Sequence, residues 1–325
     1  MSELKDFLNS GGTHAPQINE NTERLDTQIT NPNLLINGDF SVWQRGTTSV
    51  GHPSFTYAAD RWITSINGTS LNLFRADAGG DPDAFFGSRY AIGCDTGVSV
   101  SSYGHVQRIE STACGQLRAG QLVSLSFRVW TSDGAPVEVG GRMWRSNNFD
   151  DWSAFWDMAD GGTQTVNHGD VAKFTMVVPN EYYHWGTQIG IGVYDDPSVR
   201  IVAITDAKFE LGAGATPFIA DAPADNLAKC QRYFYRSTNT ETLMVSCWST
   251  PSVYGSVNAP IAMREPPIWL FEEASFFYDG GSFPVTPAVD VASTQNARFT
   301  FNHTATVTRT ASGWLQTKFS ADAEL

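Results

Sequence analysis

The segment WRSNNFDDWSAFWDMADGG, residues 144–162, mixes large aromatic rings with amide, carboxylate and guanidinium groups. Aromatic faces can cover the apolar C–H surface of a pyranose, while the polar groups hydrogen-bond neighbouring sugar hydroxyls. In a loop or bent strand, this mixture predicts a saccharide contact made by Trp152, Trp156, Asn147, Asn148, Asp150, Asp151 and Arg145. Arg145 is also available for an acidic sugar. A second aromatic group, residues 182–185, is expected to face the same cleft through Tyr183 and Trp185.

The same rings have two alternative uses. The chain contains 10 Trp, and alternate side chains of a strand point into the core, so a β domain this rich in indole rings buries many of them. Contacts between subunits are the other use. In the C-terminal region, subunit contacts, or alternatively a receptor patch, are expected to absorb several of the large rings of Tyr254, Trp269, Phe271, Phe276, Phe277, Tyr278 and Trp314.

Catalysis is not expected from this sequence. Cleavage of a glycosidic bond needs two carboxyl groups about 5 to 9.5 Å apart across the sugar. The adjacent acids at 150–151, 195–196 and 272–273 cannot supply both groups, because successive side chains of a strand point to opposite faces. Asp151 paired with Asp195 or Glu181 is the remaining combination, so a glycan-depolymerising enzyme stays an alternative. The six histidines show no metal-binding spacing.

The composition narrows the class of protein. Of 325 residues, 17% are charged and 12% are aromatic, with 29 Gly and 15 Pro, which is typical of a turn-rich β protein. A net charge of -13 argues against nucleic-acid binding, because phosphate contacts need clustered Lys and Arg. No run approaches the roughly 20 apolar residues of a membrane span. The opening residues lack the features of a signal peptide, so synthesis in the cytoplasm without membrane insertion is expected.

Strand-like runs dominate the rest of the chain, and the expected fold class is all-β. About ten short runs between turn residues in 33–220 predict an antiparallel two-sheet sandwich of the jelly-roll kind. Glycine pairs at 140–141 and 161–162 are interpreted as turns between strands. Residues 221–237 are expected to form a partly helical connector. Residues 238–325 contain five further runs, which predict a smaller antiparallel β tip domain.

Residues 1–32 differ from the rest because they are polar and nearly free of aromatic rings. Ile18, Leu25 and Ile29 follow a heptad spacing, which would let a short helix pack against copies of itself. We expect this segment to be an anchor or linker. A flexible tail that orders only on a partner surface is the alternative.

Four segments occur in a specific order: NLLINGDFSVWQRGTT (33–48), AADRW (58–62), AKFELGAGATPF (207–218) and AKCQRYFYRS (228–237). Together they resemble the fibre and spike proteins of tailed bacteriophages and gene transfer agents, whose main domain is similar to carbohydrate-binding-module jelly rolls. PIAMREPP and the final SADAEL resemble the tip domain that follows in such proteins.

The resemblance implies a fibre or spike on the virion surface, at tail or head, that attaches the particle to host surface polysaccharide such as a capsule. It implies a homotrimer without catalytic activity, assembled in the bacterial cytoplasm and joined to other virion proteins through residues 1–32. In the carbohydrate-binding modules, the first and last strands often hold a structural calcium ion, for which Asp39 and Asp206 are the nearest matches here. No other cofactor is expected. A purely structural or decorative virion protein without its own ligand is the main alternative.

Overall fold

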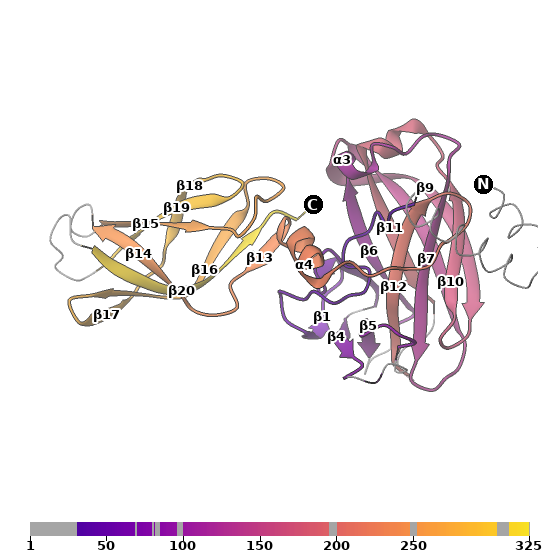
Figure 1. Ribbon diagram of the computed structural model, residues 1–325, viewed down its shortest axis with the longest axis horizontal. Helices are drawn as coiled ribbons and strands as arrows, with labels where there is room; N and C mark the ends of the chain where they lie inside the picture. The colour runs from indigo at the N-terminus through magenta and orange to yellow at the C-terminus, as the bar shows by residue number, and fades with distance from the viewer. Residues whose placement is uncertain are drawn as a thin grey trace, which may run out of the picture.

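The computed structural model describes residues 31–68, 70–79, 81, 85–95, 100–194, 200–247, 252–303 and 312–324. Nearly all of the expected anchor, residues 1–32, therefore lies outside the described residues. Two β units follow each other along the chain, a large sandwich and a smaller tip, and helix α4 lies between them (Figure 1).

The sandwich consists of two antiparallel sheets with six strands each. The first sheet has the order β1 (Thr48–His52), β4 (Leu71–Asp77), β5 (Tyr90–Asp95), β12 (Val202–Leu211), β7 (Leu122–Thr131) and β10 (Val171–Val177). The second sheet has the order β2 (Thr56–Tyr57), β3 (Ile63–Asn67), β6 (Ser102–Glu110), β11 (Gly186–Val193), β8 (Val137–Asn148) and β9 (Asp151–Val166). The prediction of an all-β chain with an antiparallel sandwich is confirmed.

The core of the sandwich forms because its strands alternate apolar and polar side chains. In β10, Ala172, Phe174 and Met176 are buried while their neighbours in the strand are exposed. The Phe174 ring stacks on Phe127 of β7, with ring centroids 5.9 Å apart. Burial of such rings is worth about 25 cal/mol per Å² of apolar surface, so this face fixes the register of the edge strand.

The residues before β1 close one end of the core. Asn37 takes a positive φ of 57°, and a Cβ on Gly38 would lie only 2.1 Å from the carbonyl oxygen of Ala207. The chain can pass this close to β12 only with glycine at this position. The indole N–H of Trp62 donates to the Asn37 carbonyl at 3.0 Å. Trp62 and Trp43 both belong to the buried core.

Helix α4 (Pro223–Gln231) connects the sandwich to the tip. Pro223 stands in its first turn, where a missing N–H leaves no helical hydrogen bond unmade. The last residues of the expected connector form β13 (Phe234–Arg236), which pairs with a strand of the tip. The short helices α3 (Ser111–Cys114) and η1 (Glu181–Trp185) lie next to strands of the second sheet.

The tip is a single antiparallel sheet that curls on itself. Its strands have the order β17 (Gly281–Pro284), β16 (Ile268–Tyr278), β20 (Ser312–Asp322), β14 (Glu241–Cys247), β15 (Ser252–Asn258), β19 (Asn296–Asn302) and β18 (Ala288–Ala292), with β13 beside β20. Three strands separate β16 from β19 in this order. Nevertheless Phe271 of β16 lies 5.0 Å from Phe299 of β19, ring centre to ring centre. The curled sheet therefore encloses its own core.

This enclosure changes the interpretation of the tip rings. Trp269 and Phe276 are buried inside the tip, and Phe271 and Tyr278 pack against the same core. These four rings therefore belong to the core of the tip and are not available for subunit contacts. Trp314 is 44% exposed and stacks on Phe277 at 6.1 Å, so this pair remains available to a partner.

The interpretation of two glycine pairs is also wrong. Residues 140–141 lie inside β8 and residues 161–162 lie inside β9, so neither pair is a turn between strands. Glycine is needed in β8 for space, because a Cβ on Gly141 would lie 2.7 Å from the Phe174 ring. Among the described residues, no helix is long and apolar enough to cross a membrane.

Candidate functional site

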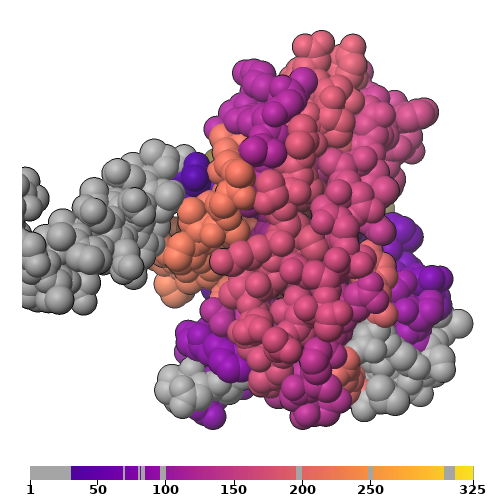
Figure 2. All heavy atoms as spheres, turned by 90° about the vertical axis from the view of Figure 1, so that its right-hand side faces the viewer, coloured from indigo at the N-terminus to yellow at the C-terminus, as the bar shows by residue number. Residues whose placement is uncertain are grey.

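The expected sugar-binding segment forms a long hairpin of β8 and β9 at the edge of the second sheet. Figure 2 shows the side of the sandwich that faces away from the tip. Residues of β9, β10 and the segments around them, in pink, form much of this surface. Asp150 in the hairpin turn has a φ of 50°. Its carboxylate accepts hydrogen bonds from the Ser111 N–H at 2.8 Å and hydroxyl at 2.9 Å. Asp150 therefore fixes the hairpin to α3.

Three of the predicted residues form one surface group. The indole N–H of Trp156 donates to Asn147 Oδ1 at 3.0 Å, and Asn147 Nδ2 donates to Asp151 at 3.0 Å. Hydrogen bonds from Ser153 and Asn147 lower the pKa of Asp151, so it is a carboxylate. Trp156 is 50% exposed, which leaves part of its ring open to a ligand. Asn148 instead accepts the Phe149 N–H at 2.8 Å.

Trp152 belongs to a different surface from Trp156. The register places Trp156 opposite Arg145 and Phe155 opposite Ser146, so these two rings point to opposite faces of the hairpin. Trp152 lies 6.2 Å from Phe155, and the Arg108 guanidinium stands 5.3 Å from the centre of its indole. Irregularities in the β8–β9 register separate the two indoles that the sequence suggested as one platform.

Arg145 and the aromatic group of η1 lie together near the hairpin. Arg145 Nε is 2.7 Å from Asp157 Oδ2, so its charge already has a carboxylate partner. Its guanidinium lies 5.4 Å from the Tyr182 ring centre and 6.0 Å from that of Trp185. Tyr183 is fully buried, with its hydroxyl donating to the Asp157 carbonyl. The prediction that Tyr183 contacts a ligand is therefore wrong.

A groove on the outer face of the second sheet was not predicted from the sequence. It has a volume of about 300 Å³ and crosses β3, β6, β11 and β8. A Cβ on Gly190 would lie 2.6 Å from the Trp144 indole, and one on Gly192 would lie 2.9 Å from the Tyr194 hydroxyl. Both rings therefore lie directly against the glycine backbone. The alternating glycines of QIGIGVY were the available signal, because they clear one face of a strand.

Arg142 supplies the charged group of this groove. Its Nε lies 3.3 Å from Asp160 Oδ2, and its guanidinium is 5.6 Å from the centre of the Tyr194 ring. Among the described residues that line the groove, none is a carboxylic acid. The groove thus combines two aromatic faces with a neutralised arginine, and those residues offer no general acid.

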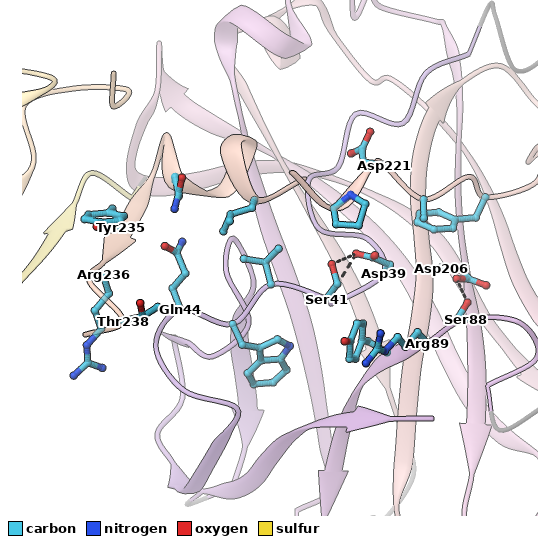
Figure 3. Close-up of a pocket in the computed structure, with 18 of the residues that line it drawn as sticks. Asp39, Ser41, Gln44, Ser88, Arg89, Asp206, Asp221, Tyr235, Arg236 and Thr238 are labelled. Atoms are coloured by element: carbon cyan, nitrogen blue, oxygen red, sulfur yellow. Dashed lines mark hydrogen bonds between the residues drawn. The ribbon is translucent and has the colours of Figure 1, made fainter. Parts of the chain in front are cut away.

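A larger cleft of about 1260 Å³ lies where the sandwich, α4 and the tip meet (Figure 3). Asp39 and Asp206 both line it. Asp206 accepts from the Ser88 hydroxyl and from Arg128 Nε at 3.2 Å. Asp39 accepts a hydrogen bond from Asn226 Nδ2 at 3.0 Å. Burial raises the pKa of Asp39, although the hydrogen bonds from Ser41 act to lower it. Both carboxylates are satisfied by protein donors, and this arrangement does not fit a calcium ion between them.

The comparisons with known proteins show only distant likeness. No family model matches the sequence, and no curated protein matches it. A cyclase from Fischerella sp. TAU is 12% identical with a TM-score of 0.38, over 57% of this chain and 100% of that chain. The CBM22-2 xylan-binding domain of Paenibacillus barcinonensis Xyn10C is 14% identical with a TM-score of 0.33, over 47% of this chain and 92% of that chain.

The enzymatically active domain of tailspike protein 4 from bacteriophage CBA120 is 13% identical with a TM-score of 0.34, over 55% of this chain and 21% of that chain. These structures differ in function, and their similarity is too low to carry an argument about this chain. We therefore base the proposed function on the geometry of this chain's own surfaces.

Proposed function

We propose that this chain is a non-catalytic, glycan-binding fibre or spike protein of a virion surface, which attaches the particle to host surface polysaccharide. The observation that carries the proposal is the outer-face groove, where the rings of Trp144 and Tyr194 lie directly against glycine residues of the sheet. Aromatic rings held in this way present flat apolar faces at little entropic cost, which suits the C–H face of a sugar.

The groove favours uncharged sugars. Arg142 is already paired with Asp160, and the chain as a whole carries a net charge of -13, which repels polyanions. A paired arginine still offers donors to sugar hydroxyls next to the acceptors of its carboxylate partner. Binding is therefore expected to change little with salt, because no charge has to be neutralised.

The hairpin supplies a second contact surface. Trp156, Asn147 and Asp151 are already held in one hydrogen-bonded group, so little ordering is needed for them to contact a ligand. An exposed platform fixes few sugar units and binds weakly. A homotrimer and many copies on one particle would raise the effective affinity through avidity.

The location is part of the same proposal. The expected anchor at residues 1–32 would join the chain to other virion proteins, after assembly in the bacterial cytoplasm. The order of the sequence segments that resemble virion fibres supports this location. It is tested by labelling particles for this chain in electron micrographs.

Binding to purified bacterial surface polysaccharides, measured by affinity electrophoresis and calorimetry, tests the glycan site. Trp144→Ala and Tyr194→Ala are each expected to weaken binding about tenfold, through loss of stacking and buried ring area. Trp314→Ala removes an exposed ring of the tip that does not line the groove, and it serves as the control. Reducing-end assays on the same polysaccharides are expected to show no release of sugar.

Each contrary result has a definite meaning. Failure of the unmodified protein to bind any polysaccharide would favour a structural or decorative virion protein. Loss of binding in Trp156→Ala, with Trp144→Ala unchanged, would move the site to the hairpin. Release of reducing ends would identify a depolymerase.

A further inference from the structure

A buried ionic cluster joins the tip to the sandwich. Residues 323 and 324 follow β20 and return towards the sandwich, and the Ala323 N–H donates to the Tyr233 carbonyl at 2.7 Å. In Figure 1 the C-terminal label stands beside α4, where the two β units meet. This return brings the Glu324 side chain, which is 5% exposed, to two arginines of the sandwich.

Arg61 is the inner arginine of this cluster. It lies between β2 and β3 with a positive φ of 73°, and only 1% of its side chain is exposed. Its guanidinium donates to the Glu324 carboxylate and lies 3.5 Å from the centre of the Tyr233 ring. Burial lowers the pKa of Arg61, but the neighbouring Glu324 carboxylate raises it, and the net result is a raised pKa. The guanidinium therefore stays charged.

Arg45 is the outer arginine and makes several contacts across the same boundary. It lies 3.5 Å from Glu324, 3.4 Å from Asp322 and 3.6 Å from Asp60. Its guanidinium also covers the Phe234 ring of β13, 3.5 Å from the ring centre. Since these partners come from both β units, Arg45 ties the loop before β1 to the tip sheet.

A second buried contact reinforces the first. Glu110 of β6 accepts from Arg232 at 3.0 Å and from the Tyr233 hydroxyl. Burial would raise the pKa of Glu110, but these two hydrogen-bond donors bring it below its ordinary value. Both partners of Glu110 stand directly after α4, so the contact fixes the chain between the sandwich and the tip.

Without the Glu324 carboxylate, docking of the two units would bury the Arg61 guanidinium with no carboxylate partner. A buried charge that loses its partner is strongly destabilising, whereas an exposed ion pair contributes little. This cost therefore depends mainly on Glu324, because its carboxylate pairs with Arg61 and also lies 3.5 Å from Arg45. We infer that Glu324 is a latch that fixes the direction of the tip, so that the two β units move and unfold as one body.

The experiment compares the full chain with Glu324→Gln and Glu324→Ala. Glu273→Gln is the control, because it removes the same charge from a tip residue that is 82% exposed. Calorimetry of the unmodified chain and the control is expected to show one cooperative transition. Both Glu324 variants are expected to show two transitions, one for each unit.

Spin labels on Ser153→Cys in the sandwich and Ser282→Cys in the tip measure the same coupling as a distance distribution. A narrow distribution is expected for the unmodified chain, and a broadened one for the Glu324 variants. Arg45→Met provides an independent break of the cluster if the Glu324 variants fail to fold. One transition and an unchanged distribution in all folded variants would overturn the latch. These measurements involve no glycan, so they stand or fall apart from the proposed function.

Discussion

Replacing Asp60 by Asn is expected to remove a pH dependence of stability that its buried carboxyl group creates. The Asp60 side chain has no exposed surface. Its Oδ2 accepts from Gln44 Nε2 at 2.6 Å, and its Oδ1 accepts from the Gln44 N–H at 3.1 Å. Burial raises the pKa of Asp60 to about 7, against the lowering by Arg45 and Gln44. Asn keeps the shape of the neutral side chain.

The sign and size of the effect follow from linkage. In the unfolded chain an Asp has a pKa of about 3.9. As pH rises from about 4 to about 7, the unfolded chain loses this proton while the folded protein keeps it, so the free energy of unfolding falls. A shift from 3.8 to about 7 corresponds to about 4 kcal/mol, at about 1.4 kcal/mol per unit. Above about pH 8 the carboxyl is ionised in both states and its contribution is constant.

Urea unfolding followed by tryptophan fluorescence, at steps between about pH 4 and 8.5, measures this effect. The free energy of unfolding of the unmodified protein minus that of Asp60→Asn is expected to fall by about 4 kcal/mol over this range. Groups with lowered pKa values, such as Glu110, act with the opposite sign. They are present in both proteins and cancel in the difference. A difference that stays constant within about 1 kcal/mol would refute the argument.

Three further substitutions test local geometry. Gly190→Ala places a methyl group 2.6 Å from the Trp144 ring and is expected to weaken glycan binding at least as much as Trp144→Ala, which affinity electrophoresis measures. Asp150→Ala removes two hydrogen bonds to Ser111; a loss of about 1 to 3 kcal/mol and faster hydrogen exchange of the Ser111 amide are expected. Gly38→Ala sets a Cβ 2.1 Å from the Ala207 carbonyl oxygen, and urea unfolding is expected to show a loss of about 3 kcal/mol; an unchanged midpoint would contradict the close packing.

Patterns of period two predicted most of the fold. Alternation of the kind seen in β10 identifies a half-buried strand, and the turn residues between such runs separate the sandwich from the tip. The Asn-Gly pair at 37–38 is a typical turn signal, and Asn37 has a positive φ that few residue types adopt. Trp43 and Trp62 lie beside this turn and are both buried in the core.

The candidate sites were harder to predict, because they depend on which strands become neighbours. Irregular register in the β8–β9 hairpin places Phe155 and Trp156 on opposite faces, and no local pattern fixes where a bulge falls. The sequence does not distinguish Tyr183 from the other aromatic residues of its run. Its burial results from the direction in which η1 points its side chain. Trp144 and Tyr194 can be identified as groove residues only once the pairing of the strands places glycines directly beneath their rings.

The contact between Arg61 and Glu324 spans 263 residues of chain, and this separation has a consequence for biogenesis. A ribosome delivers the sandwich long before it delivers Glu324, because translation runs from the N-terminus. The Arg61 side chain must therefore stay hydrated while the sandwich folds. Pairing with Glu324 dehydrates it only afterwards, so we expect the union of the two halves to be a late step in maturation of the nascent polypeptide.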